Sequence, residues 1–318
     1  MKLEKLRHLQ KELISVVFEN SDIKAITDFL FFSYLGARIC YASSHPLALF
    51  SEEKFKNFET FKNFLLHLKK LEHYSVFAHT PVFVNTENIE VEQKLVLAQI
   101  YFKVFWDEPK KQALFNLRHL AENLSEEQFA KLIEIPPDLT SIEIVYFKNN
   151  QNLYQGTLLE FPYHLLEEDH NNFFATPEVI IIKQLKPYPF NWVGVIVHNF
   201  SRIFSHQFVR HTWLNFNQRS HRYTEVDKFI LPKNFSDYHV KTYQEIIEYT
   251  MKYYKDFMKE LKRESARFLV PQGVATTLLA TGPEFVWEDF INKRAIPQAQ
   301  EEIKNLAFLL KEHLFKNR

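Results

Sequence analysis

Residues 207–223 read Gln-Phe-Val-Arg-His-Thr-Trp-Leu-Asn-Phe-Asn-Gln-Arg-Ser-His-Arg-Tyr, and this stretch, here called the strip, decides how the chain is interpreted. Three arginines and two histidines fall within at most about five helical turns. So much charge would need too many partners to form a buried face. Trp213, Phe216 and Tyr223 make the strip too aromatic for an ordinary solvated face. Guanidinium groups bind phosphate through paired hydrogen bonds, and aromatic rings stack on planar heterocycles, so the strip predicts a site for an anionic nucleotide.

The composition limits what kind of protein this is. The chain has 318 residues, 46% of them hydrophobic, with 39 basic and 39 acidic side chains. Zero net charge argues against a general nucleic-acid binder, which usually carries a basic excess. Only five glycines are present, and neither a G-x-G-x-x-G motif nor a P-loop occurs. Any phosphate site must therefore be local and built from side chains and helix ends.

The remaining composition signals concern compartment and redox chemistry. The single cysteine, Cys40, excludes a disulfide within the chain, and we expect it to be a small buried apolar residue. No apolar run approaches the length of a membrane span, and the first residues have no signal-peptide core. We therefore expect a cytoplasmic protein without a membrane partner.

The hydrophobic patterns predict an α+β fold with a mixed or antiparallel sheet flanked by long helices. Strands are expected at 80–84, 141–147, 177–182 and 191–197, where apolar and β-branched residues concentrate. Helices are expected at 91–106, 110–123, 125–133, 202–210, 238–269, 285–293 and 298–313. Thr281-Gly-Pro283 predicts a turn.

Three further clusters carry chemistry-bearing side chains, and each is a weak signal alone. Residues 72–79 hold His73, Ser75 and His79, but no third ligand is locally spaced, so no metal site is predicted. Ala266-Arg267-Phe-Leu-Val-Pro271 places an arginine before a helix break, where it also suits the helix dipole. Residues 289–302 combine a charged helix with a second helix start.

Taken in order, these motifs resemble those of the flavin-dependent thymidylate synthases, whose hallmark is R-H-R-x-x-S-x-N-E-x-S-x-R-Y. The matching stretch here runs from Arg210 to Tyr223. The family's A-R-x-C-Y stretch is present at 37–41, its histidine turn at 73–79, and its S-R-x-x-x-x-Q-x-x-R-H approach at 201–211. Its A-R-x-x-L-P and F-x-x-x-R-x-x-x-x-A-Q-x-E-I elements correspond to 266–271 and 290–303.

The resemblance covers roughly residues 25–85 and 191–310. It divides the chain into an N-terminal part of the synthase-like domain (1–84), an inserted α/β subdomain of unknown role (85–190) and a C-terminal part that carries the motifs (191–318). It implies roles for individual residues. Those implied to contact dUMP are Gln207, Arg210, Gln218, Ser220, Arg222, Tyr223, Arg267 and Arg294, of which Arg210, Arg294 and Ser220 would act in catalysis. Those implied to contact FAD are His73, Ser75, His79, His211, Thr212, Asn217, Asp289 and Gln300.

The chain departs from the family mostly on the flavin side. Thr212 stands where the family has an arginine, Gln218 replaces the hallmark glutamate and Ala78 replaces the glutamate of the histidine turn. Pro283 and Phe285 occupy the places of the family's N-x-R. Residues 116–118 have that N-x-R form, so we hypothesise that Asn116 and Arg118 replace it. A surface helix with an ordinary asparagine at its start is the more conservative interpretation.

The resemblance implies reductive methylation of dUMP to dTMP, with FAD as the cofactor, methylenetetrahydrofolate as the carbon donor and NADPH as the reductant. It also implies a homotetramer whose sites draw on several subunits. Two alternatives stay open at this stage. A diverged homologue could transfer another one-carbon group, or could bind a pyrimidine nucleotide without flavin as a sensor or partner subunit.

Overall fold

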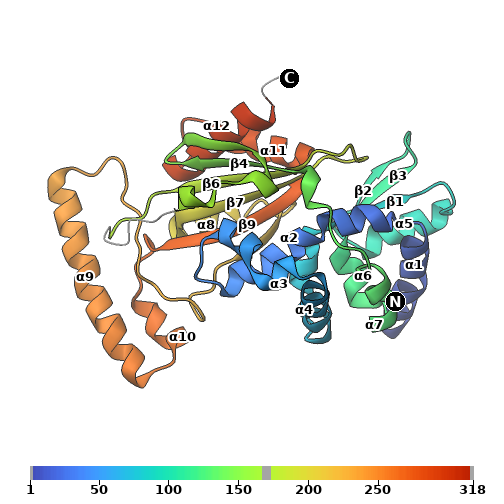
Figure 1. Ribbon diagram of the computed structural model, residues 1–318, viewed down its shortest axis with the longest axis horizontal. Helices are drawn as coiled ribbons and strands as arrows, with labels where there is room; N and C mark the ends of the chain where they lie inside the picture. The colour runs from blue at the N-terminus through green and yellow to red at the C-terminus, as the bar shows by residue number, and fades with distance from the viewer. Residues whose placement is uncertain (1–2, 167–172, 316–318) are drawn as a thin grey trace.

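A six-stranded antiparallel sheet forms the centre of the computed structural model, which describes residues 3–166 and 173–315. Its strand order is β5-β4-β6-β7-β9-β8. A second sheet of three antiparallel strands, in the order β1-β3-β2, lies beside it (Figure 1). The strands are β1 (Pro81–Asn85), β2 (Phe105–Asp107), β3 (Gln112–Asn116), β4 (Ile142–Lys148), β5 (Gln151–Thr157), β6 (Glu178–Gln184), β7 (Trp192–Ser201), β8 (Asn215–Gln218) and β9 (Ala275–Pro283).

The helices cover the sheets and form the rest of the described chain. The α-helices are α1 (Leu3–Glu19), α2 (Ile23–Tyr41), α3 (Glu53–Lys56), α4 (Phe58–Lys70), α5 (Val91–Ile100), α6 (Leu117–Asn123), α7 (Glu126–Lys131), α8 (Arg202–Phe208), α9 (Asp237–Glu260), α10 (Arg263–Ala266), α11 (Glu284–Arg294) and α12 (Glu301–Leu314). The 3-10 helices are η1 (Pro46–Ser51), η2 (Tyr74–His79), η3 (Leu139–Ser141), η4 (Leu158–Glu160), η5 (Tyr163–Leu166) and η6 (Arg267–Leu269).

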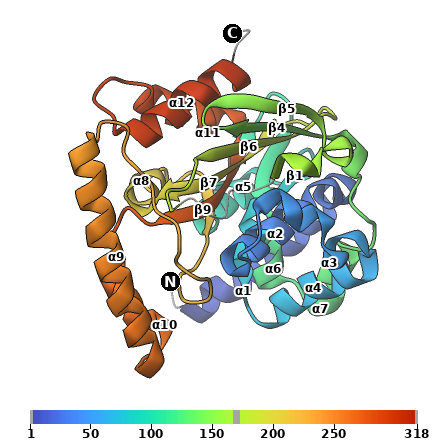
Figure 2. The same cartoon turned by 60° about the vertical axis from the view of Figure 1, so that its left-hand side comes forward.

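The large sheet is covered by helices on both faces, so its central strands are apolar on both sides. Alternate residues of β6 point to opposite cores: Ile180 and Ile182 pack with α2, whereas Val179 and Ile181 pack with α11 and α12. Helices α11 and α12 lie above the sheet in Figure 1 and α2 lies below it, and Figure 2 shows the same layers. Where α2 crosses β7, a side chain at Gly194 would come within 2.1 Å of Phe32, so glycine permits this close approach.

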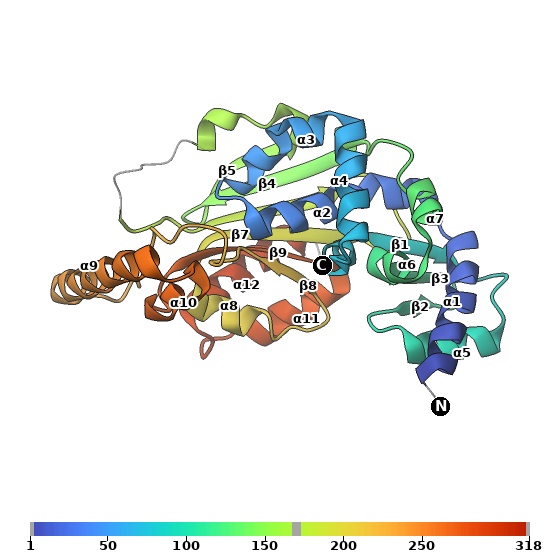
Figure 3. The same ribbon diagram turned by 90° about the horizontal axis from the view of Figure 1, so that it is seen from below.

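Helix α9 extends away from the rest of the chain, as Figures 1 and 3 show. Ile247, Met251 and Tyr254 are its buried residues. Ile246, Tyr249, Tyr253 and Phe257 are exposed and follow one another at helical spacing. The described part of the chain contains no helix with both the length and the apolarity that crossing a bilayer requires.

The predicted α+β class and antiparallel sheet are confirmed, but four predicted elements were wrong. The helix expected at 91–106 ends at Ile100, and residues 105–107 form β2. The helix expected at 110–123 begins only at Leu117, because 112–116 pair as β3 with both β1 and β2. The helix expected at 238–269 ends at Glu260, where Leu261 is extended.

The predicted turn at 281–283 is instead the end of β9. Thr281 pairs with Asn215, and Pro283 pairs with Trp192 at the last position of the strand. Gly282 serves close packing here, since a side chain at that position would lie 2.7 Å from Leu214. A proline is tolerated at this end of the strand, where α11 begins immediately afterwards.

The segment 85–190 does not form a sheet of its own. Its strand β3 pairs with β1, and β6 pairs with β7 over six residue pairs from Glu178↔His198 to Lys183↔Val193. Strands β4 and β5 extend the same sheet outward. Whether the segment is an insertion relative to the family remains a prediction, but its strands continue the sheet that carries the motifs.

Candidate functional site

The strip folds as a turn, a short edge strand and a second turn. Helix α8 ends at Phe208, and the Leu214 amide donates to the carbonyl of His211 to close the first turn. β8 then pairs with β9, and Tyr223 and Thr224 donate to the carbonyl of Ser220 in the second turn. Because β8 is an edge strand of the sheet, the two turns at its opposite ends are accessible.

The Ala37–Tyr41 motif packs directly on the strip. The Ser220 amide donates to the carbonyl of Cys40 at 3.0 Å. The Asn217 side-chain amide donates to the Gly36 carbonyl and contacts Cys40 Sγ, each at 3.1 Å. The rings of Tyr41 and Tyr223 lie 5.0 Å apart. Two distant motifs therefore meet through specific contacts.

His79 is fully buried beneath the strip. Its Nδ1 lies 2.9 Å from Thr281 Oγ1 and its Nε2 lies 2.9 Å from Asn217 Oδ1. Burial lowers the pKa of His79 to about 4, so the ring is neutral near pH 7. These contacts give His79 and Asn217 a structural role, and their predicted contact with flavin stays untested. His73 and Ser75, by contrast, are exposed on and beside η2.

A cationic cluster surrounds the second turn of the strip and consists of Arg202, Arg219, His221 and Arg267. Burial, and then the charges of the three arginines, lower the pKa of His221 to about 4. Burial and then the charge of Arg267 lower the pKa of Arg202. Within the described ranges, neither Arg202 nor Arg267 lies within 4.0 Å of a carboxylate. Arg202 and Arg267 thus bring two guanidinium groups together without a carboxylate beside either among the described residues, which suits the binding of a phosphate.

Arg222 and Tyr223 lie beside this cluster and are held by α10. The Arg222 guanidinium contacts Glu264 at 2.9 Å and lies over the Tyr223 ring at 5.5 Å. Arg263 donates to the Tyr223 carbonyl at 2.8 Å. The Ala266–Pro271 motif therefore reaches the strip through the residues just before it as well as through Arg267.

The first turn of the strip meets the C-terminal motif instead. Arg294 Nε donates to His211 Nε2 at 2.9 Å, and the His211 ring lies 4.8 Å from Phe290. Burial, and then the charge of Arg294, lower the pKa of His211 to about 4. Arg210 and Thr212 flank His211 and are exposed. An accessible guanidinium pair, Arg210 and Arg294, is thereby placed at this end.

The predicted dUMP residues therefore fall into two groups, at the two ends of α8. Arg202 begins the helix and Arg210 follows it, so about 12 Å of helix axis separates these two positions. Gln207 lies in the last turn of α8. Gln218 lies at the end of β8 and donates to Thr276 Oγ1 at 3.1 Å. Ser220 Oγ accepts from the Arg222 amide at 3.3 Å, a local turn bond that pairs the hydroxyl with no base.

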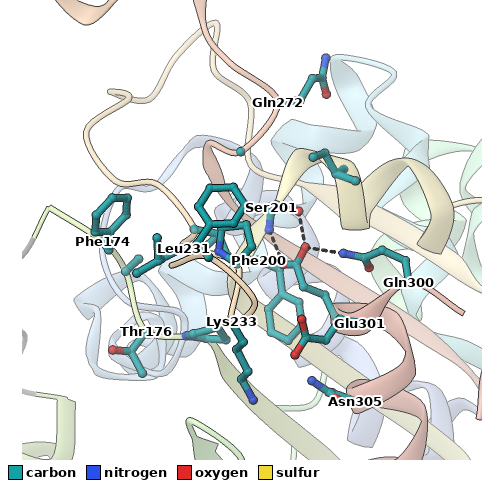
Figure 4. A pocket seen from close by; sticks show the side chains of 18 of the residues that line it. Phe174, Thr176, Phe200, Ser201, Leu231, Lys233, Gln272, Gln300, Glu301 and Asn305 are labelled. Atoms are coloured by element: carbon teal, nitrogen blue, oxygen red, sulfur yellow. Dashed lines mark hydrogen bonds between the residues drawn. The ribbon is translucent and has the colours of Figure 1, made fainter. Parts of the chain in front are cut away.

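The remaining predicted residues lie elsewhere. Gln300 caps α12, donates to Glu302 at 3.1 Å and helps to line a pocket of about 580 Å³ beside Ser201, Phe174 and Leu231 (Figure 4). Asp289 is exposed and paired with Lys293 at 2.7 Å. Asn116 is buried, and its Oδ1 has no hydrogen-bond partner among the described residues. Arg118 Nε contacts Glu122 at 2.6 Å.

Sequence reasoning missed several residues that the fold brings to these sites. Arg202 and His221 were not assigned, because nothing in their local spacing shows that the chain returns Arg267 to them. It also missed a buried group of metal-ligand types formed by His45, Glu178 and His198. The Leu47 amide donates to His45 Nδ1, so the ring proton resides on Nε2, which faces Glu178 Oε2 at 2.6 Å. This arrangement favours a buried hydrogen-bonded network over a site that binds a metal ion.

The described structure is thus an α+β protein in which guanidinium groups from distant segments gather around one edge strand. Residues 189–317 match the family model described as thymidylate synthase complementing protein. Three similar proteins are flavin-dependent thymidylate synthases: that of Thermococcus onnurineus is 30% identical over 128 residues, 37% of this chain and 51% of the relative. Those of Sulfurisphaera tokodaii and Sulfolobus acidocaldarius are 31% and 32% identical, over 38% and 35% of this chain and 49% and 45% of the relatives.

These matches confirm the family resemblance predicted from the motifs. They cover the C-terminal part of the chain, which carries the strip, the Ala266–Pro271 motif and the final two helices. The aligned part of the chain spans about half the length of the curated relatives it matches.

Proposed function

We propose that this protein is a flavin-dependent thymidylate synthase that methylates dUMP reductively to dTMP, with methylenetetrahydrofolate as carbon donor and NADPH as reductant. The observation that carries the proposal is that the matched motifs, or the helical turn just before one of them, contact the strip. Cys40 contacts Ser220 and Asn217 from one side, Arg263 contacts Tyr223 from another, and Arg294 contacts His211. Motifs that are far apart in sequence have no other evident reason to converge on one edge strand.

The cationic cluster suits the phosphate of dUMP. A phosphate monoester carries close to two negative charges at neutral pH, and arginine binds it through two parallel hydrogen bonds. Arg267 and Arg202 lack carboxylate partners within the described ranges, so a phosphate would not have to displace an acidic side chain from them. Arg222 forms an ion pair with Glu264, so its guanidinium would contact both that carboxylate and the ligand.

Arg210 and Arg294 suit the uracil ring. Methylation at carbon 5 requires the ring to become nucleophilic, and negative charge then develops on its carbonyl oxygens. A fixed guanidinium beside those oxygens stabilises that charge without reorganising during the reaction. Arg294 is oriented by its hydrogen bond to the neutral His211, which leaves its other N–H groups available to a ligand.

The chain's own nucleophiles are not equipped for covalent catalysis. Burial raises the pKa of Cys40, whose sulfur also contacts the Asn217 side chain, so a thiolate is disfavoured. Within the described part of the chain, the Ser220 hydroxyl makes one side-chain hydrogen bond, in which it accepts from the Arg222 amide. We therefore assign Ser220 to binding the substrate and leave the ring activation to the guanidinium pair.

A flavin fits the surface beside the first turn of the strip. Trp213 and Phe285 are exposed there, at 52% and 44%, and such rings can stack on a planar heterocycle. Thr212, His73, Ser75, Asp289 and Gln300 are the accessible members of the predicted flavin set. The bound flavin would supply hydride transfer. The protein would hold it against the substrate and exclude water from the reacting atoms.

We also infer a homo-oligomer, as a tetramer. The two groups of guanidinium side chains lie at opposite ends of α8, so completing one site around one nucleotide calls for a second copy of the chain. The exposed residues Ile246, Tyr249, Tyr253 and Phe257 on α9 offer an apolar face for such a copy.

The test is to assay the purified protein with FAD, NADPH, dUMP and carbon-labelled methylenetetrahydrofolate. We expect label in dTMP, FAD-dependent turnover and a yellow protein with flavin absorbance. A colourless protein that binds dUMP but cannot be reconstituted with FAD would contradict the proposal and favour a nucleotide sensor. Flavin binding with turnover of a different nucleotide or one-carbon group would contradict the assignment of the substrate.

A further inference from the structure

Lys103 reaches the strip from the segment 85–190. It lies in the loop between α5 and β2, and its ammonium donates to the Leu214 carbonyl at 2.8 Å and to Asn215 Oδ1 at 2.9 Å. Its backbone is in the left-handed region, with φ at 59°. A non-glycine residue held in that region stores strain, which often marks a functional position.

Among the described residues, Lys103 has only neutral hydrogen-bond acceptors. Both acceptors are neutral, and within 3–166 and 173–315 no carboxylate lies within 4.0 Å of its ammonium. Burial, and then the positive charge of Arg118, lower the pKa of Lys103 to about 8. Two like charges held together in a partly buried place are costly unless an anion lies between them.

Phe102 and Phe105 lie next to Lys103 in the chain and bring further aromatic rings close to the first turn of the strip. Phe102 is 58% exposed, and the Arg118 guanidinium lies 5.9 Å from the centre of its ring. Phe105 lies 5.3 Å from Trp213 and 4.8 Å from Phe285. Cations beside accessible rings match a ligand that joins a phosphate group to planar heterocycles.

We propose that Lys103 and Arg118 bind the diphosphate of the flavin dinucleotide, in place of the guanidinium that the family carries where this chain has Thr212. The inference rests on the proposed function, and it adds two residues from the segment 85–190 to the site. Lys103 contacts residues 214 and 215 of the strip itself, so it lies at the first turn, beside the surface where we propose that the flavin binds. Arg118 would divide its charge between Glu122 and the ligand. Asn116 takes no part, because it is buried.

The test compares FAD with riboflavin, which lacks phosphate, by fluorescence titration of wild type, Lys103→Gln, Lys103→Arg and Arg118→Gln. Loss of a charge-assisted hydrogen bond should weaken FAD binding about 10- to 100-fold in both glutamine variants. Riboflavin binding should change less than about twofold, and Lys103→Arg should retain most FAD affinity because it keeps the charge. Lys110→Gln removes an exposed cation of the same segment, paired with Asp107, and is the matched control.

Circular dichroism and dUMP calorimetry on each variant would show that the fold and the substrate site are intact. Equal losses for FAD and riboflavin, or FAD affinity unchanged in both glutamine variants, would overturn the assignment while leaving the proposed function standing. A wild-type protein that binds neither flavin would overturn both. If the glutamine variants bind NADPH more weakly but bind FAD normally, the assignment to FAD is also overturned. Lys103 and Arg118 would then bind the diphosphate of NADPH.

Discussion

Strands β4, β5 and β6 of the segment 85–190 share one sheet with β7, β8 and β9 of the C-terminal part, but the two regions differ in how their basic side chains are paired. In the described part of the segment, most basic side chains have acidic partners: Lys94 with Glu108, Lys110 with Asp107, Lys111 with Glu87, Arg118 with Glu122, Lys148 with Glu178 and Lys186 with Asp28 and Asp138. In the C-terminal part, Arg202, Arg267 and Arg294 have no carboxylate within 4.0 Å among the described residues. Paired cations add little to function, whereas cations held near one another without acids indicate an anionic ligand. Among the described lysines of the segment, Lys103 and Lys183 donate to neutral oxygens instead, and Lys103 is the one that contacts the strip.

The largest effect should come from Arg294→Gln. If its guanidinium stabilises charge that develops on the uracil carbonyl, kcat should fall about 100- to 1000-fold, the loss typical of removing one such donor. The dissociation constant for dUMP should change much less. The neighbouring Lys293→Gln removes a cation paired with Asp289 and should leave kcat nearly unchanged. An equal fall in kcat in both variants would contradict the claim that cations without an acidic partner act in catalysis whereas paired cations do not.

Arg267→Gln should act on binding. Arg267 is exposed, so we expect about 10- to 100-fold weaker dUMP binding by calorimetry, the loss typical of one charge-assisted hydrogen bond of about 1.5–3 kcal/mol. Deoxyuridine, which lacks the phosphate, should bind wild type and variant alike. Lys259→Gln, on the exposed part of α9, is the control for overall charge. If dUMP and deoxyuridine lose affinity equally, Arg267 does not contact the phosphate.

Asn217→Ala should reduce stability. Its side chain joins His79, Gly36 and Cys40, and removing it leaves the buried His79 Nε2 without a partner. The free energy of unfolding should fall by roughly 1–3 kcal/mol in urea denaturation. Flavin affinity of the folded variant should stay close to that of wild type if the role is structural. A specific loss of flavin affinity with unchanged stability would instead support the flavin contact implied by the resemblance.

The smallest expected effect is a titration change at His221. Burial and three arginine charges lower its pKa to about 4, so it is neutral and its protonation is opposed. A bound phosphate would offset those charges and raise the pKa, by about one unit for 1.4 kcal/mol of interaction. Histidine NMR titrations with and without dUMP would measure the change. A pKa that stays the same or falls on binding would place the phosphate away from the cationic cluster.

The sequence predicted the parts of this molecule that local pattern controls. The β-branched runs at 141–147, 177–182 and 191–197 are strands because they are buried on both faces, and the order of the motifs indicated the family resemblance. It could not predict that Gly282 and Pro283 end a strand, since glycine and proline have the same local signal in a turn. Nor could it predict Lys103, whose role depends on a tertiary contact with Leu214 and Asn215. Long-range pairing, unlike periodicity, leaves no trace in the spacing of one sequence.

The most direct measurement is the visible absorbance of the FAD-reconstituted protein during titration with dUMP. The account predicts a saturable change in the flavin bands with dUMP and none with deoxyuridine at the same concentration, because the phosphate would seat the pyrimidine beside the isoalloxazine. Flavin bands that respond equally to both compounds, or to neither, would contradict a nucleotide held by its phosphate next to the flavin.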